Sequence, residues 1–391
     1  MEQHRPFHLQ LKLERERRGW SQADLAKYVG KISVKTIRRW ENGQSRPQPF
    51  YRQTFINLFG KSLEELGLVV QPDPADEMED PPHKEDWGEA PRGHPFYGRG
   101  EEQAQLQNWM TQQHSRIIAV IGIGGIGKTA LAAKAVVHVK DAFTAVFWRS
   151  LHNAPPLDLF LQQCLQFLFL QPQPLPTSSD DLLILLHHHL QNQRCLLVLD
   201  NFESLLQPGQ SVGQYRDGYE PYGRLLRLLG ETEHQSCLLL TSREKPREMA
   251  SLEGKHSPVR SLRLEGVGER EGKEILQEKD LFGSEENWTE LVRLYSGNPL
   301  ALKLVAVSIQ EVFAGAIETF LKDEEIVFGD INRLVDQQFH RLSTLEQEVL
   351  YWLAIEREAV PLEEIREDLT RPASKGIFVE VIASLLRRSL I

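Results

Sequence analysis

The sequence predicts a multidomain protein in which all-α domains flank a central three-layer α/β domain. Residues 8–66 show helical periodicity broken by short turns. Residues 93–264 alternate apolar, strand-like runs with amphipathic helical stretches, which indicates a mainly parallel sheet with right-handed crossovers. Beyond residue 265 the periodicity is helical only. The expected domains are residues 1–70, 93–264, 265–328 and 329–391, and residues 71–92 are expected to be an acidic linker.

Five short apolar runs are expected to form the strands of the sheet. Each of them is separated from the next by a stretch with helical periodicity, which is the pattern of repeated strand–helix–strand units. They are Ile117–Ile121, Ala145–Arg149, Cys195–Asp200, Cys237–Thr241 and Val259–Leu264.

Charge is unevenly distributed along the chain, whose formal net charge is −10. Residues 1–71 carry thirteen Lys and Arg against seven Asp and Glu, which gives +6. Residues 72–91 carry one Lys against eight Asp and Glu, which gives −7. The first domain is therefore basic, and the proline-containing acidic stretch after it has the composition of a flexible linker.

The three cysteines, Cys164, Cys195 and Cys237, lie far apart, each within an apolar run. This pattern indicates reduced core thiols and argues against disulfides or a metal site. The N-terminus is polar and charged, unlike a signal peptide, and no apolar run approaches the roughly eighteen residues that a membrane helix needs. We therefore expect a soluble, cytoplasmic protein and exclude the secreted and integral-membrane classes.

The segment Gly122–Thr129 is a complete G-x-x-x-x-G-K-T phosphate-binding loop. It follows an apolar run and precedes a helix-compatible stretch, a context that separates such a loop from a chance glycine cluster. Glycines let the backbone curl around phosphates, Lys128 reaches the β- and γ-phosphates, and the Thr129 hydroxyl binds Mg²⁺. The predicted phosphate-binding residues are Gly122, Gly124, Gly125, Ile126, Gly127, Lys128, Thr129 and Ala130. The chain is expected to bind a nucleoside di- or triphosphate.

The run Leu196–Glu203, LLVLDNFE, predicts a buried strand that ends at a second Mg²⁺ ligand, the carboxylate of Asp200. The next residue is Asn201, whose amide can orient water but is not a useful general base. Glu203 is the nearest carboxylate and is a candidate base, although it could instead pair with a neighbouring cation. Slow hydrolysis is the consequence we expect.

Arg243 follows another strand run, in Leu240-Thr-Ser-Arg, at the sheet edge where the phosphates are expected. A fixed guanidinium suits phosphate oxygens, so Arg243 is the candidate sensor of a γ-phosphate. The alternative is a surface arginine on a loop.

Two further motifs, FYGR at 96–99 and GNPLAL at 297–302, complete a recognisable order with the phosphate loop, LLVLDNFE and LLLTSRE. From residue 93 to the end, the chain resembles the NB-ARC class of STAND ATPases, an NLR-like branch of the AAA+ superfamily. The resemblance implies that ATP or ADP is bound with Mg²⁺. It also implies that Phe96, Tyr97 and Arg99 line the adenine side, and that Pro299 reaches the nucleotide from the helical domain.

In the basic domain, Ser21 and Ser33 are predicted to cap two short helices joined by a tight turn, a helix-turn-helix. The strings SQADLA and TIRRWENG are similar to the phage-repressor helix-turn-helix family. The second helix of such a unit enters the major groove of double-stranded DNA. The candidate DNA contacts are Gln22, Ser33, Lys35, Thr36, Arg38 and Arg39. The alternative is a protein-binding adaptor whose basic face is merely solvated.

The stretch from residue 345 to 388 resembles the winged-helix domain that follows the helical domain in NB-ARC proteins, without its β-wing. We expect the chain to be the N-terminal part of a longer protein, with a sensor domain beyond Ile391. The function predicted is a switch that opens and self-associates when ATP replaces ADP, with a DNA-binding, transcriptional or signalling output, as in bacterial defence. An AAA+ motor acting on DNA is the alternative.

Overall fold

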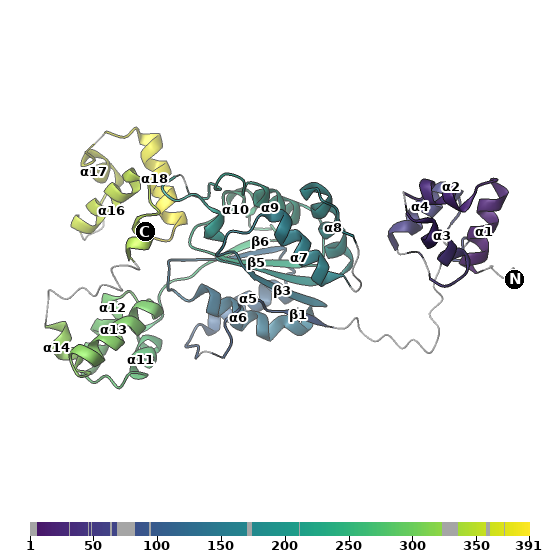
Figure 1. The fold of residues 1–391 in the computed structure, drawn as a ribbon. Helices are drawn as coiled ribbons and strands as arrows, with labels where there is room; N and C mark the ends of the chain where they lie inside the picture. The colour runs from purple at the N-terminus through teal and green to yellow at the C-terminus, as the bar shows by residue number, and fades with distance from the viewer. Residues whose placement is uncertain are drawn as a thin grey trace. The chain divides into compact units, whose positions relative to one another are not determined.

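The structure is a computed structural model, and its described residues divide into two compact units, Met1–Asp80 and Pro81–Ile391. Figure 1 shows that the first unit is all helical and that the second is built on a sheet. The described residues are 6–30, 32–45, 47, 49–62, 65–68, 83–93, 95–169, 174–210, 212–322, 335–356, 360–370 and 372–391.

Four helices make up the described part of the N-terminal unit. They are α1 (Phe7–Arg17), α2 (Gln22–Tyr28), α3 (Val34–Glu41) and α4 (Pro49–Phe59). The Ser21 and Ser33 hydroxyls accept hydrogen bonds from backbone N–H groups in the first turns of α2 and α3, so both predicted caps are present. Apolar side chains from all four helices meet in one core, among them Leu11, Leu25, Ile37, Trp40 and Phe55. The α2–α3 pair is the predicted helix-turn-helix.

The second unit contains a six-stranded sheet in the order β1-β3-β4-β5-β2-β6, with every neighbouring pair parallel. Its strands are β1 (Lys84–Asp86), β2 (Ile117–Ile121), β3 (Ala145–Ser150), β4 (Cys195–Asp200), β5 (Cys237–Ser242) and β6 (Val259–Arg263). The five predicted runs are β2 to β6, with ends that differ by one residue at most. All residues of β2, β4 and β5 are buried, as expected for central strands covered on both faces.

β1 corrects the predicted linker. The predicted linker includes residues 83–92, yet Lys84–Asp86 pairs in parallel with Ala145–Phe147 of β3. The Trp87 indole that follows packs into the core of the sheet. The charged sequence of β1 suits an edge strand, because one side of such a strand faces solvent. The remaining residues of the predicted linker, 71–82, lie outside the described residues.

Helices cover both faces of the sheet (Figure 1). α5 (Gly100–Thr111) and α6 (Lys128–Val139) pack with alternate residues of the strands into one core, which includes Val120, Trp148 and Val198. α7 (Leu157–Leu168), α8 (Ser179–Asn192) and α9 (Pro221–Glu231) pack against the opposite residues of the same strands, with α10 (Arg247–Leu252) beside α9. This is the predicted three-layer arrangement, and the multidomain α and α/β class is confirmed.

Two helical groups follow β6. α11 (Glu269–Gln277), α12 (Glu285–Leu294), α13 (Pro299–Val312) and α14 (Ile317–Leu321) share one core. α16 (Thr344–Glu356), α17 (Leu362–Glu367) and α18 (Lys375–Arg387) share another. These last three helices lie in the stretch for which a partial winged helix is predicted, and β6 is the last strand defined in the described residues. The predicted boundary near residue 329 lies outside the described residues.

All three cysteines lie in the cores on the two faces of the sheet. All three cysteines are buried and unpaired, and burial raises the thiol pKa to about 11 for Cys195 and to about 12 for Cys237. In the part of the chain that the structure describes, each helix is too short or too polar to cross a lipid bilayer.

Candidate functional site

The phosphate-binding loop connects β2 to α6 at the carboxyl edge of the sheet. Gly125 and Gly127 have φ of +78° and +99°, a backbone region that side chains strain to adopt. At Gly122 a Cβ atom would lie only 2.8 Å from the backbone oxygen of Leu264, so close packing against the end of β6 requires glycine there. These glycines are therefore demanded by the loop geometry, as the motif predicts.

Lys128 is the first residue of α6, and its side chain is buried within the loop. Its Nζ donates hydrogen bonds to the carbonyl oxygens of Gly122 and Ile123, at 2.9 and 3.0 Å. Burial lowers the pKa of Lys128 to about 8; the nearby carboxylate of Glu203 opposes this shift and the guanidinium of Arg243 adds to it. The ammonium group is thus largely shielded from water, and it lies where the phosphate-binding motif predicts the phosphates to bind.

Asp200 ends β4 and joins three parts of the site. Its Oδ1 accepts hydrogen bonds from the hydroxyls of Thr129, at 2.8 Å, and Thr241, at 2.5 Å. Burial raises the pKa of Asp200, and these two hydrogen bonds act in the opposite direction. The Thr129 hydroxyl and the Asp200 carboxylate are adjacent hard oxygen donors, the type that Mg²⁺ prefers, so the two predicted metal ligands fit that ion.

Asn201 holds the Asp200 carboxylate from its other side. The Asn201 Nδ2 lies 3.2 Å from Asp200 Oδ2 and 3.3 Å from Ser150 Oγ, while its backbone N–H donates to Thr241 Oγ1 at 3.1 Å. The residue has φ +61°, which Asn tolerates better than most residues. Its amide therefore works as a donor that orients Asp200.

Glu203 and Arg243 form an ion pair beside the loop. Arg243 Nε lies 3.2 Å from Glu203 Oε1, and the Arg243 backbone N–H donates to Glu203 Oε2, also at 3.2 Å. A Cβ atom on Gly124 would lie 3.1 Å from Arg243 Cζ, so the guanidinium is next to the phosphate loop. The candidate base and the candidate sensor are thus bonded to each other, and both carboxylate oxygens of Glu203 are engaged.

The three residues predicted for the adenine side have different surroundings. Arg99 is buried, and its guanidinium donates to the carbonyl oxygens of Ile126, at 3.0 Å, and Glu265, at 2.7 Å. The Tyr97 hydroxyl donates to Glu278, and its ring packs against the core of α11–α14. Arg99 thus supports the loop backbone, and Tyr97 joins the helical group.

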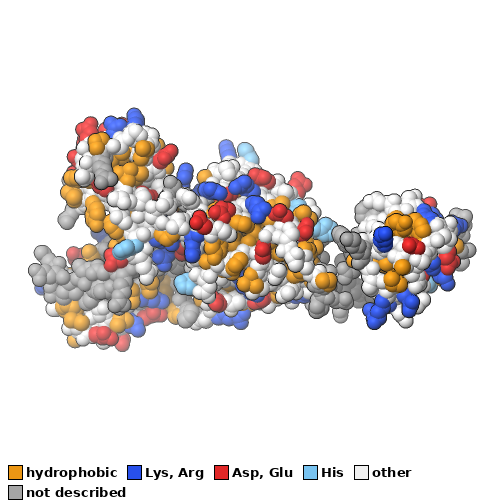
Figure 2. Space-filling model, turned by 45° about the horizontal axis from the view of Figure 1, so that its top comes forward, with side chains coloured by type: hydrophobic (Ala, Val, Ile, Leu, Met, Phe, Trp, Pro, Cys, Tyr) orange, Lys and Arg blue, Asp and Glu red, His pale blue; other side chains and the backbone are white. Residues whose placement is uncertain are grey.

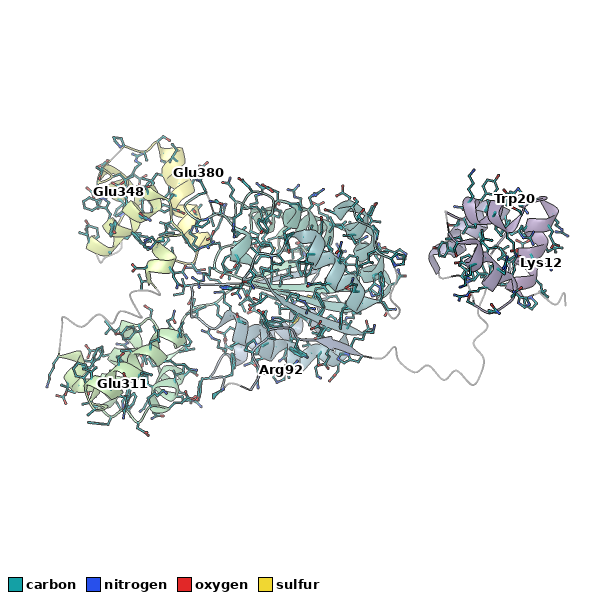
Figure 3. The ribbon with its side chains drawn as sticks, viewed as in Figure 1. Lys12, Trp20, Arg92, Glu311, Glu348 and Glu380 are labelled. Atoms are coloured by element: carbon teal, nitrogen blue, oxygen red, sulfur yellow. The ribbon has the colours of Figure 1, made fainter. Side chains whose placement is uncertain are left out.

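Phe96 faces an open cavity. It borders a cavity of about 400 Å³ together with Ala130, Ala133 and Val137 of α6. The Arg92 guanidinium, labelled in Figure 3, lies 5.6 Å from the centre of the Trp87 ring at the same cavity. Phe96, an adenine-side candidate, and Ala130, a predicted phosphate-binding residue, therefore line one open apolar space.

The GNPLAL segment contacts the phosphate loop through the neighbours of Pro299. Asn298 Nδ2 donates to the Gly124 carbonyl at 2.9 Å, and its Oδ1 caps α13. The Leu300 N–H donates to the Gly125 carbonyl at 3.3 Å. Sequence reasoning singled out Pro299 and missed Asn298, although Asn before a helix-initial Pro is a recognisable N-cap signal.

Residues 335–341 bring a further, unpredicted group to the site. Arg341 Nε donates to Glu244 Oε1 at 2.6 Å, and its Nη2 donates to the Glu203 carbonyl at 3.0 Å. Arg388, at the end of α18, lies 2.7 Å from the same Glu244 oxygen and 3.2 Å from Glu346 Oε1. We call Glu244, Arg341, Arg388 and Glu346 the ion cluster. It attaches the C-terminal helices to Glu244, the residue that follows Arg243.

The candidate DNA contacts separate into two groups. Gln22 Nε2 donates to the buried Glu41 at 2.7 Å, and the Ser33 and Thr36 hydroxyls bond each other at 2.8 Å, so these three serve the unit itself. The remaining candidates are exposed, and no ion pair within the described residues engages their side chains. They are Lys35, Arg38 and Arg39. Figure 2 shows Lys and Arg side chains gathered along one edge of this unit.

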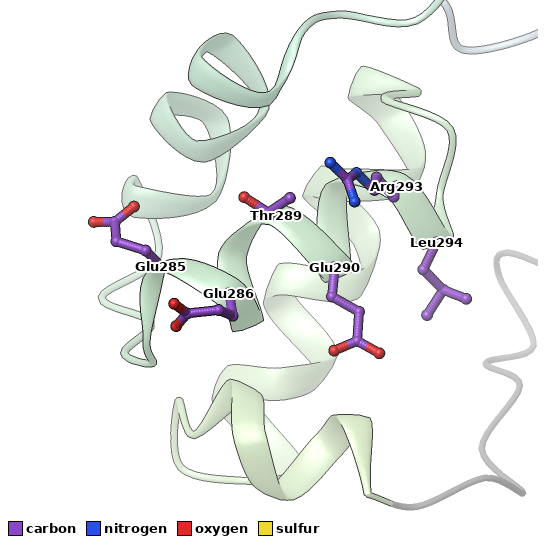
Figure 4. Close-up of a pocket in the computed structure, with 6 residues that line it drawn as sticks. All are labelled: Glu285, Glu286, Thr289, Glu290, Arg293 and Leu294. Carbon is purple, nitrogen blue, oxygen red and sulfur yellow. The ribbon is translucent and has the colours of Figure 1, made fainter.

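A shallow hollow of about 750 Å³ on α12 does not contain any of the predicted site residues (Figure 4). Three of its six lining residues are glutamates, and Arg293 within it pairs with Glu269 at 2.8 Å. This hollow is a solvated surface of the helical group.

Two family models match separate parts of the chain. The helix-turn-helix family model matches residues 11–66, and the NACHT domain model matches residues 116–280. A WD repeat-containing protein of Nostoc sp. (strain PCC 7120) is 45% identical over 323 residues, which are 79% of this chain and 26% of that protein. A nucleotide-binding leucine-rich repeat (NLR)-like protein of Hyaloscypha variabilis is 27% identical over 55% of this chain and 22% of its own length. The chain thus spans about a quarter of these curated relatives.

Among solved structures, the chain is similar to a protein of Pyrococcus horikoshii described as a Signal Transduction ATPase with Numerous Domains (STAND) with a tetratricopeptide repeat sensor. The identity is 21%, the match covers 78% of this chain and 41% of the other, and the TM-score is 0.42.

The lowered pKa of Lys128 predicts a pH dependence of nucleotide binding. Phosphates favour the charged ammonium, whose pKa in the free protein is about 8. Affinity for ADP should be constant below this pH and then fall by up to about tenfold per unit, because binding must take up a proton. Titration calorimetry from pH 7 to 10 measures this, and a flat profile to pH 9.5 would contradict it.

Substitution of Asp200 tests the metal site. Asp200→Asn keeps the size of the side chain and its contact with Thr129 but removes the charge. We expect ATP affinity in the parent to rise when Mg²⁺ is added and the variant to lose that increase, while Mg²⁺-free ADP still binds. Equal Mg²⁺ dependence in both proteins would remove Asp200 from the metal site.

Proposed function

We propose that this chain, a P-loop NTPase of the STAND class with a helix-turn-helix domain and a NACHT domain, is a molecular switch controlled by ADP and ATP. The STAND class and the helix-turn-helix domain predicted from the motifs are confirmed, and the family model that matches is that of the NACHT domain, where the sequence analysis named NB-ARC. In the proposal the ADP form is closed, and exchange for ATP opens it and permits self-association.

The observation that carries the proposal is the convergence of separate parts of the unit on the phosphate loop. Asn298 and Leu300 bond Gly124 and Gly125 from the helical group. Arg341 bonds the backbone of Glu203, which in turn pairs with Arg243. A change at the phosphates would therefore act on contacts that hold both helical groups. A ligand shifts such an equilibrium only by its differential affinity for the two forms, and contacts of this kind supply it.

Slow hydrolysis belongs to the same proposal. Asn201 donates its amide to Asp200 and offers no basic group, and Glu203 is bonded through both carboxylate oxygens to Arg243. Neither Asn201 nor the engaged Glu203 carboxylate therefore offers a free basic group to a water molecule at the γ-phosphate. A constitutive AAA+ motor acting on DNA, the alternative, needs rapid turnover, so this feature favours the switch.

The output is proposed to run through the helix-turn-helix domain. The exposed Lys35, Arg38 and Arg39 suit DNA phosphates and bases at the start and outer face of α3. The competing candidate is a protein-binding adaptor.

A cytoplasmic location is part of the proposal, and a repeat domain such as the WD repeats named in the Nostoc relative would serve as its sensor.

Turnover measurements test the switch. We expect the purified protein to retain ADP and to hydrolyse ATP at well below about 1 per second, the lower end of ordinary kinase turnover. Asn201→Asp places a carboxylate at a position whose backbone Asp tolerates, and should raise the rate about 100-fold, as a general base does. Turnover of tens per second in the parent would contradict the proposed switch. Loss of residual activity in Glu203→Gln would identify Glu203 as the base.

Self-association is followed by sedimentation of the same preparations with ADP and with a non-hydrolysable ATP analogue. The expected result is a monomer with ADP and a larger species with the analogue. Identical sedimentation with both nucleotides, at concentrations that saturate binding, would contradict opening by exchange.

Fluorescence anisotropy with random duplex DNA at low salt tests the output. We expect binding that weakens with salt, and the Arg38→Ala and Arg39→Ala double variant should bind more weakly and lower the salt slope by about 2, one for each lost phosphate contact. Lys12→Ala, on an exposed part of α1 labelled in Figure 3, is the matched control and should bind as the parent does. Absence of binding by the parent would favour the adaptor.

A further inference from the structure

The cavity that Phe96 borders lies between the outer face of α6 and the segment that leads from β1 to α5. Residues between 87 and 96 form one wall, and α6 forms the other from Ala130 to Lys140. The volume of about 400 Å³ is within the size range of sites for small organic molecules. The size of the cavity therefore suits a small ligand.

The walls of this cavity are largely apolar and are held in place by the core of the sheet. Trp87 stacks on Trp148 with the ring centres 6.4 Å apart, and its Nε1 donates to Glu85 at 2.6 Å. On the opposite wall, Ala133 and Val137 are four residues apart, so they lie on one face of α6. The Val137 side chain is half exposed. A ligand with an apolar body would remove this surface from water, which is favourable.

Each charged side chain that the structure describes in the lining is a cation, although the whole chain has a net charge of −10. These cations are Arg92, Lys134 and Lys140. Lys140 Nζ lies 2.6 Å from Glu85 Oε1, and the Arg92 guanidinium lies over the Trp87 ring. Lys134 is exposed, and no ion pair among the described residues engages it. The charge that complements this lining is negative.

The cavity extends away from the nucleotide site. Phe96 packs with the core that contains α6, whereas the next residue, Tyr97, packs with the core of α11–α14. The two rings thus face different parts of the unit, and the helical group that bonds the phosphate loop is on the side of Tyr97. Only the Ala130 end of the cavity adjoins the loop, because Lys140 lies ten residues further on, about 15 Å along the helix.

We propose that this cavity is a second ligand site, separate from the nucleotide site, and that it takes an amphipathic anion. The ligand class is a small molecule with a planar apolar body and one acidic group. The body packs between Trp87 and the Ala133–Val137 face of α6, and the acidic group pairs with Lys134. This inference goes beyond the proposed switch and does not depend on it.

The test uses two fluorescent probes that differ only in charge. 8-Anilinonaphthalene-1-sulfonate has a planar aromatic body and one sulfonate, and N-phenyl-1-naphthylamine has the same body without the sulfonate. Both are titrated into the 391-residue chain, without nucleotide and with saturating ADP and Mg²⁺. We expect one site per chain, a preference for the sulfonate of about fivefold, and binding that persists when ADP is bound.

Two pairs of variants place the probe in the cavity. Val137→Asp puts a carboxylate in the lining and should weaken binding of the sulfonate about tenfold. Ile184→Asp makes the same kind of change at an exposed position of α8 and should bind as the parent does. Lys134→Gln keeps most of the side chain without its charge and should abolish the preference for the sulfonate, whereas Lys12→Gln, also at an exposed lysine, should keep it.

The affinity for ADP distinguishes this site from a part of the nucleotide site. Val137→Asp should bind ADP as the parent does. If ADP displaces the probe and Val137→Asp also binds ADP more weakly, the cavity belongs to the nucleotide site and the proposal is overturned.

Two other results would also overturn it. They are equal sulfonate affinities in Val137→Asp and Ile184→Asp, and a sulfonate preference that survives Lys134→Gln. The second result decides the matter even if Val137→Asp does not fold. A parent that binds the probe as expected but binds no nucleotide would contradict the proposed function and support this site.

Discussion

The hydrogen bonds of the Asp200 carboxylate hold together the sheet edge on which the rest of the site depends. They connect the first turn of α6 through Thr129, the end of β5 through Thr241 and the backbone turn at Asn201. A buried carboxylate is costly unless it is satisfied, and here both oxygens accept donors. Because α6, β5 and the turn at Asn201 all donate hydrogen bonds to this one carboxylate, the phosphate loop, the metal ligands and Arg243 are held in fixed positions relative to one another.

The ion cluster attaches the C-terminal helices to the sheet edge through buried charges. Glu244 and Arg388 are almost fully buried, with side chains only 2% and 3% exposed. Desolvation offsets most of the attraction between buried charges, so such pairs add little net stability but demand one geometry. An interface of this type suits a part that must be positioned closely in one state and released in another.

Sequence reasoning succeeded where hydrophobic pattern and local chemistry coincide. Five strands were predicted because each is an apolar run with polar residues at its ends, and the glycines of the loop follow from its backbone conformation. It failed for β1, whose sequence Lys84–Asp86 is charged and forms a strand only by pairing with β3 at the edge. It also missed Asn298, which lies far along the chain from the loop that it contacts.

The sequence by itself determined the fold class, the phosphate-binding loop, the position of Asp200 and the helix-turn-helix, because these depend on residues close together in the chain. Only the tertiary structure decided what surrounds the phosphates. It paired Glu203 with Arg243, turned the Arg99 guanidinium onto the loop backbone and set Asn298 against Gly124. The physical reason is that such contacts join residues separated by tens to hundreds of positions, and their geometry comes from packing, which no local pattern encodes.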